Sequence, residues 1–133
     1  MTSARSSSFL RRVLIIDAAV SGATGLILIA GADLLHDWLA VPAALARGAG
    51  LSLIPFALLV GYLATRQSMP RAGVWAVIVL NALWALDSML LLASGLVSPT
   101  ALGTAFIIAQ ALAVAVLAEL EYVGLRRSVA VPA

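Results

Sequence analysis

Four polar side chains interrupt apolar stretches and are the residues best suited to chemistry: Asp17, Asn81, Asp87 and Gln110. On insertion scales, placing an aspartate at the centre of a membrane helix costs about 2.5–3.5 kcal/mol of free energy. Such a residue therefore normally faces the protein interior and is protonated or paired. Carboxylates that gain and lose a proton, with amides between them, suit a proton or cation path. The alternative is structural: a protonated aspartate bonds to an amide or hydroxyl and locks the helices together.

The helical repeat gathers these residues on one face of each helix that would carry them. Ser21 follows Asp17 by four residues, and Asp87 and Ser88 follow Asn81 by six and seven. At about 100° per residue, each set forms a stripe that we expect to face inward. The candidate residues for an intramembrane polar site or ion path are therefore Asp17, Ser21, Asn81, Asp87, Ser88 and Gln110.

The composition indicates the elements that must position these side chains. The 133 residues are 63% hydrophobic and only 11% charged, whereas soluble domains are about 25% charged. Four apolar segments each approach the roughly 20 residues that a helix needs to cross a bilayer. They cover residues 13–32, 48–65, 73–94 and 100–120.

These segments are longer than barrel strands and lack their alternation, which favours helices. We therefore predict an all-α membrane protein with four transmembrane helices in a compact bundle. Its helical domain is expected over residues 10–123, between a flexible N-terminal tail, 1–9, and a cytoplasmic C-terminal tail, 124–133.

The arginines predict an orientation. Seven of the eight fall before the first segment, between the second and third, or after the fourth, and Arg47 alone falls on the other side. The positive-inside rule then places both termini in the cytoplasm. The chain is short and all its basic residues are arginines, which suggests a bacterial inner membrane.

A weak internal match suggests two tandem two-helix hairpins. At an offset of 64 residues Asp17 aligns with Asn81, and at shorter offsets Pro42 aligns with Pro99 and Tyr62 with Tyr122. Matches of this kind also arise by chance in chains rich in Leu and Ala, so the repeat is an expectation only.

Small residues indicate where helices approach closely. The first segment has Gly22 and Gly25, and the fourth has an alanine at every fourth position. These faces form either an oligomer interface or contacts within one bundle, and we favour the second. The alanines are Ala101, Ala105, Ala109 and Ala113.

The loop after the first segment is expected to form a short interfacial helix whose polar face carries Asp33, His36 and Asp37. One histidine and two carboxylates on a loop make a poor zinc site, so a solvated face is the favoured interpretation over a metal or pH-sensing site.

The end of the fourth segment carries a group of charges. We interpret this group as an interfacial anchor in which arginines extend toward water and pair with the acids. Its members are Glu119, Glu121, Arg126 and Arg127.

No catalytic motif appears, and the chain has no cysteine and one histidine. We therefore expect no enzyme activity, no cofactor or metal, and no nucleic-acid partner. In size, span number and its helix-1 acid the chain resembles the small multidrug-resistance exporters, but that acid is Asp17 rather than glutamate. The resemblance is one of architecture, and it implies neither their activity nor their sites.

Two functions remain open. The first is a structural, accessory or binding subunit of a membrane complex, with the lipid bilayer and a homo-oligomer or membrane-protein partner around it. The second is a small proton-coupled transporter or channel that uses Asp17, Asn81, Asp87 and Gln110. From the sequence we rank the first slightly higher.

Overall fold

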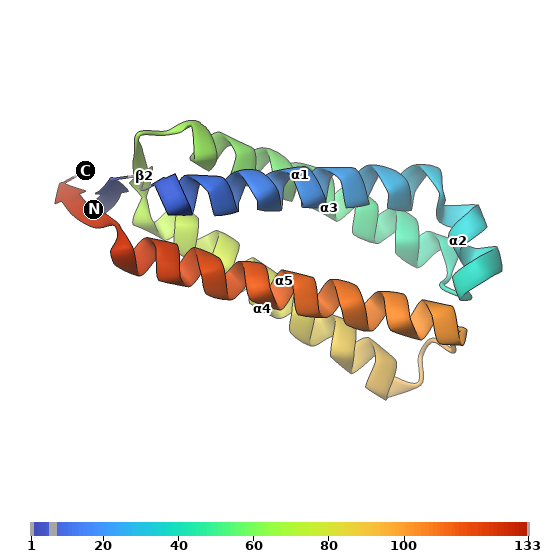
Figure 1. Cartoon of the computed structure of the whole chain (residues 1–133). Coiled ribbons are helices and arrows are strands. Elements are labelled where there is room, and N and C mark those ends of the chain that lie inside the picture. Colours follow the sequence, from blue (N-terminus) through green and yellow to red (C-terminus); the bar gives the residue numbers. More distant parts are fainter. Residues whose placement is uncertain (1, 6–7, 133) are drawn as a thin grey trace.

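The computed structural model describes residues 2–5 and 8–132, most of which are helical. Four long helices run alongside one another, and a short helix, α2 (Ala32–Leu39), joins the first two (Figure 1). Each long helix is long and apolar enough to cross a membrane, which confirms the prediction of four such segments. The long helices are α1 (Ser8–Ala30), α3 (Ala43–Thr65), α4 (Arg71–Ser94) and α5 (Ala101–Arg127).

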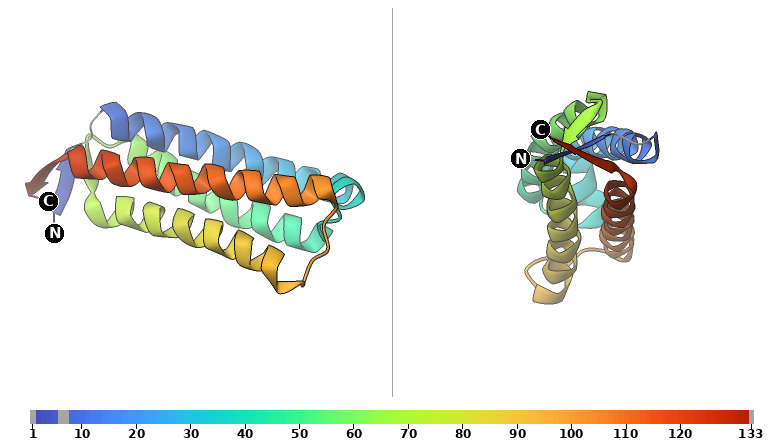
Figure 2. Two further views of the ribbon diagram at one scale, coloured as in Figure 1. Left: turned by 60° about the horizontal axis from the view of Figure 1, so that its bottom comes forward. Right: turned by 90° about the vertical axis from the view of Figure 1, so that its left-hand side faces the viewer.

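Three short strands gather at one end of the bundle. β1 (Thr2–Arg5) lies in the middle and pairs antiparallel with β2 (Ser68–Pro70) and with β3 (Val129–Pro132). Both chain ends and the α3–α4 connection therefore meet at this end, as both figures show (Figures 1 and 2). We call it the sheet end and the opposite end the α2 end. The sequence pattern predicted none of these strands.

The helices extend beyond the expected apolar segments, mostly at the sheet end. α1 begins at Ser8 and α5 continues to Arg127, so the helical part exceeds the expected 10–123. Residues 2–5 form a strand within the segment expected to be a flexible tail, while residues 1, 6 and 7 lie outside the described part. In this extension of α1, Arg11 donates to the carbonyls of Ala64 and Arg66 at 2.6 and 3.1 Å, which ties α1 to the end of α3.

The long helices form two antiparallel pairs, α1 with α3 and α4 with α5. Near the sheet end, both pairs contribute to one buried cluster that includes Leu14, Val60, Val77 and Leu125. Toward the α2 end the ribbons of the two pairs diverge (Figure 1). The bundle is therefore closely packed at one end and more open at the other.

Glycines let α1 and α3 approach closely within one chain. A Cβ built on Gly50 would lie 2.7 Å from the carbonyl oxygen of Gly25, and one on Gly22 would lie 3.7 Å from Ala57 Cβ. The glycine face of the first segment thus packs inside the bundle. The alanine face of α5 is instead exposed, at Ala101, Ala105, Ala109 and Ala113.

Candidate functional site

A buried polar cluster joins three helices in the closely packed half of the bundle. Asp17 of α1 is fully buried, and Asn81 of α4 is only 3% exposed. Asn81 Nδ2 donates to Asp17 Oδ2 at 2.8 Å, and Ser21 Oγ donates to Asp17 Oδ1 at 3.0 Å. Three residues that the sequence placed on two separate stripes therefore meet.

Glu121 of α5 completes this cluster, which corrects its interpretation as part of an interfacial anchor. Its side chain is fully buried, and Asn81 Nδ2 donates to Glu121 Oε1 at 2.8 Å. The arginines that follow lie over aromatic rings instead: Arg126 over Tyr122 and Arg127 over Phe9. Glu119, on another face of α5, is exposed as expected.

The second oxygen of Glu121 lacks a donor. Among the described residues, no group donates a hydrogen bond to Glu121 Oε2, although this atom is buried. The carboxyl groups of Asp17 and Glu121 are neighbours, because both accept a hydrogen bond from the same nitrogen, Asn81 Nδ2. Both hydrogens of the Asn81 amide are already used, one for each acid. Neither amide hydrogen is therefore left for Glu121 Oε2.

The cluster lies at one depth in the bundle. Asp17 is nine residues from the start of α1, Asn81 is ten residues from the start of α4, and Glu121 is six residues from the end of α5. At about 1.5 Å of rise per residue, these positions are roughly 9–15 Å from the sheet-end tips of their helices. The cluster is therefore well inside the apolar part of the bundle.

A second set of polar contacts links α4 and α5 nearer the α2 end. Trp84 Nε1 donates to Gln110 Oε1 at 2.8 Å, and Gln110 Nε2 donates to Ser88 Oγ at 2.9 Å and to the Ile107 carbonyl at 2.8 Å. Ser88 in turn donates to the Trp84 carbonyl at 2.8 Å. Gln110 thus links α4 to α5 and makes no hydrogen bond with the buried cluster among the described residues.

A pocket of about 530 Å³ lies between the two helix pairs, where they diverge. This volume falls within the range of roughly 300–1,000 Å³ that small-molecule sites occupy. Its wall is mainly apolar, and among the described residues Asp87 supplies the only carboxylate on it. Asp87 is exposed, and it lies six residues beyond Asn81 in α4, which is roughly 9 Å along the helix axis. The other polar groups on the wall belong to Ser21, Thr24, Ser52, Trp84, Ser88 and Gln110.

Ser21 belongs to both features. It lines the pocket, and its hydroxyl donates to Asp17 in the buried cluster. A hydroxyl both donates and accepts hydrogen bonds. Ser21 therefore forms a one-residue polar connection between the pocket and the buried carboxyl groups.

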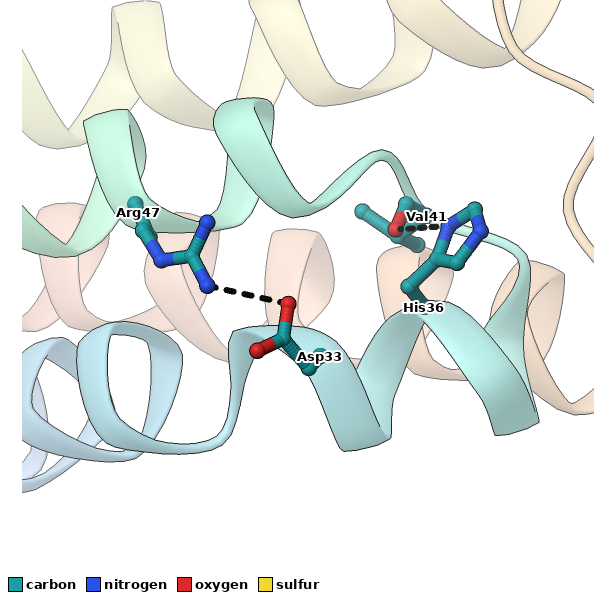
Figure 3. A network of polar contacts seen from close by, with 4 residues as sticks. All are labelled: Asp33, His36, Val41 and Arg47. Carbon is teal, nitrogen blue, oxygen red and sulfur yellow. Dashed lines mark hydrogen bonds and ion pairs between the residues drawn. The ribbon is translucent and has the colours of Figure 1, made fainter.

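The polar face of α2 forms a separate group at the α2 end. Arg47 Nη2 contacts Asp33 Oδ1 at 2.9 Å, and His36 Nδ1 lies 3.3 Å from the Val41 carbonyl oxygen (Figure 3). A short helix forms over Ala32–Leu39, as expected. Within residues 2–5 and 8–132, no three histidine or acidic side chains are grouped as metal ligands would be.

Glu121 is the member of the buried cluster that sequence reasoning missed. It follows Gln110 by eleven residues, which is about three helical turns, so the two share a face of α5. That periodicity was a usable signal. The expected end of the fourth segment at residue 120 hid it, because Glu121 then appeared to belong to the water interface.

The chain matches no protein-family model, no curated protein and no solved structure. Its function must therefore be inferred from the arrangement of its own residues.

Proposed function

We propose that this chain is an integral membrane protein, with the sheet end in the cytoplasm. Support comes from its four long apolar helices and from the position of the arginines: seven belong to the sheet-end segments, and Arg47 lies at the α2 end. The positive-inside rule favours this orientation. We retain the bacterial inner membrane as the expected location.

Within that membrane, the chain acts as a small proton-coupled transporter of an amphiphilic cation. The observation that carries this proposal is the pocket with one carboxylate on its wall and one hydroxyl, Ser21, leading to buried carboxyl groups. Asp87 matches a positive charge, and the apolar wall matches a hydrophobic body. An anion or a highly hydrated ion would find neither cationic groups nor enough polar ligands there.

Coupling follows from the short connection through Ser21. A cation that enters the pocket adds positive charge near the buried carboxyl groups, and in a medium of low dielectric constant this charge makes a proton on them less favourable. Binding of the cation and of the proton then compete. Such competition is the requirement for exchanging one for the other across the membrane.

A second candidate function is that of an accessory subunit, the one ranked first from the sequence. The exposed alanine face of α5 favours it, because small residues allow another membrane helix to approach closely. The pocket and the buried acids have no role in that account. We therefore place transport first.

Flux in proteoliposomes tests the transport proposal. The substrate probe is benzyltrimethylammonium, whose permanent charge carries no proton of its own, and neopentylbenzene is its uncharged analogue. We expect the cation, and not the analogue, to drive proton movement that an entrapped pH dye reports. Asp87→Asn should abolish this movement, whereas Asp37→Asn, on the exposed face of α2, should preserve it. If the cation drives no proton movement in either wild type or Asp87→Asn, the proposal is contradicted.

A further inference from the structure

We infer that Asp17 and Glu121 form a carboxyl pair that holds a single shared proton at neutral pH, with Asn81 bridging the two acids. The two acids and Asn81 thus form a proton-binding site in the closely packed half of the bundle. It deepens the proposed function by naming where the exchanged proton resides, but its existence does not require transport.

Hydrogen-bond satisfaction gives the first reason. Glu121 Oε2 is buried, and no donor among the described residues reaches it, while the Asp17 carboxyl group is its neighbour on the same Asn81 nitrogen. Two ionised carboxylates that share one amide donor would repel each other and leave Oε2 unsatisfied. A proton on Glu121 Oε2, donated to Asp17, supplies the missing hydrogen bond.

The surroundings give the second reason. Both side chains are fully buried, and burial of an isolated carboxylate is far more costly than burial of the neutral acid. The ion pair found among the described residues joins Asp33 and Arg47 at the other end of the bundle. Among residues 2–5 and 8–132, no ion pair joins an arginine to either buried acid, so a proton must reduce the charge.

The third reason is the donor set around the pair. Ser21 and Asn81 together give three hydrogen bonds: two to Asp17 and one to Glu121. This asymmetry stabilises a negative charge on Asp17 and leaves the proton on Glu121. Asp17 is then the acceptor within the pair and also the acid that faces Ser21 and the pocket.

Proton transfer through Ser21 balances without another protein group. A hydronium ion in the pocket gives a proton to Ser21 Oγ while the original hydroxyl proton passes to Asp17 Oδ1. The hydronium becomes water, Ser21 is regenerated, and the pair becomes neutral with two protons. The reverse steps return it to one proton.

Infrared spectroscopy of the purified full chain tests the shared proton, because a protonated carboxylic acid has a carbonyl band separate from that of a carboxylate. At neutral pH we expect this band in wild type, its complete loss in Glu121→Gln, and its loss or a shift in Asp17→Asn. Asp87→Asn should keep the band as in wild type. Circular dichroism confirms that each variant is folded.

The result that overturns the inference is a folded wild type without the band, or a band that is unchanged in either Glu121→Gln or Asp17→Asn. The outcomes also separate the two proposals. If the band behaves as expected but benzyltrimethylammonium drives no proton movement, the proton site stands and the transport function fails.

Discussion

Asn81 of α4 donates to Asp17 of α1 at 2.8 Å, joining two helices that otherwise contact each other little. The same amide nitrogen reaches Glu121 of α5. One side chain therefore ties three helices across the boundary between the two helix pairs. Asp17 and Asn81 are also the two residues that align in the internal repeat at an offset of 64.

Removing the bridging amide should destabilise the bundle. In Asn81→Ala both acids lose a donor, and hydrogen bonds between membrane helices contribute about 0.6 kcal/mol each and up to ~1.7. We expect a loss of about 1–3 kcal/mol in the free energy of unfolding, measured by denaturation in detergent. Asp37→Ala, at an exposed position, is the control and should stay within ~0.5 kcal/mol. An unchanged midpoint for Asn81→Ala would show that the bridge does not hold the helices.

The α1–α3 contact predicts that alanine substitutions at two glycines of α3 change the free energy of unfolding by very different amounts. A Cβ at Gly50 would lie 2.7 Å from the Gly25 carbonyl oxygen, whereas nothing lies within 4 Å of a Cβ at Gly48. Overpacking typically costs about 1–3 kcal/mol, so Gly50→Ala should lower the unfolding free energy by that amount. Gly48→Ala should be neutral or slightly stabilising. Equal effects would contradict the close approach of α1 and α3.

Gln110 should stabilise the α4–α5 pair without affecting the buried carboxyl pair. Gln110→Leu removes its bonds with Trp84 and Ser88 and leaves the Trp84 indole N–H without this acceptor. We expect a loss of about 1–2 kcal/mol in unfolding free energy and a shift in tryptophan emission. The infrared band of the carboxyl pair should not change, since Gln110 does not contact it. A lost band would place Gln110 in the proton site after all.

The ion pair at the α2 end should contribute little. Arg47 and Asp33 are 48% and 84% exposed, and exposed pairs typically contribute about 0.2–1 kcal/mol because water and salt screen them. A double-mutant cycle with Asp33→Asn and Arg47→Gln should give a coupling energy below ~1 kcal/mol that falls as salt is added. A larger, salt-independent coupling would indicate that α2 depends on this pair.

The sequence predicted the parts of the fold that depend on local composition. Hydropathy and length located four helices, and the period of 3.6 residues correctly placed Asp17 and Ser21 on one buried face. It could not show that Asn81 reaches Asp17, because that contact depends on how two helices dock. Glu121 was missed for a related reason: an acid beside arginines looks interfacial unless its helix is known to continue to Arg127.

Local sequence patterns could not predict the three short strands either. β1 has a partner only because the α3–α4 connection and the C-terminal segment come to the same end of the bundle. Likewise, the pocket exists because the two helix pairs diverge. No pattern within a single segment records either relationship.

The most direct test of the account is proton release on cation binding, measured in weakly buffered detergent solution with the purified protein. Benzyltrimethylammonium should release protons from wild type, and the release should disappear in Glu121→Gln while calorimetry still detects cation binding. Asp87→Asn should lose both binding and release. Cation binding to wild type without any proton release would contradict the coupling of the pocket to the buried carboxyl pair.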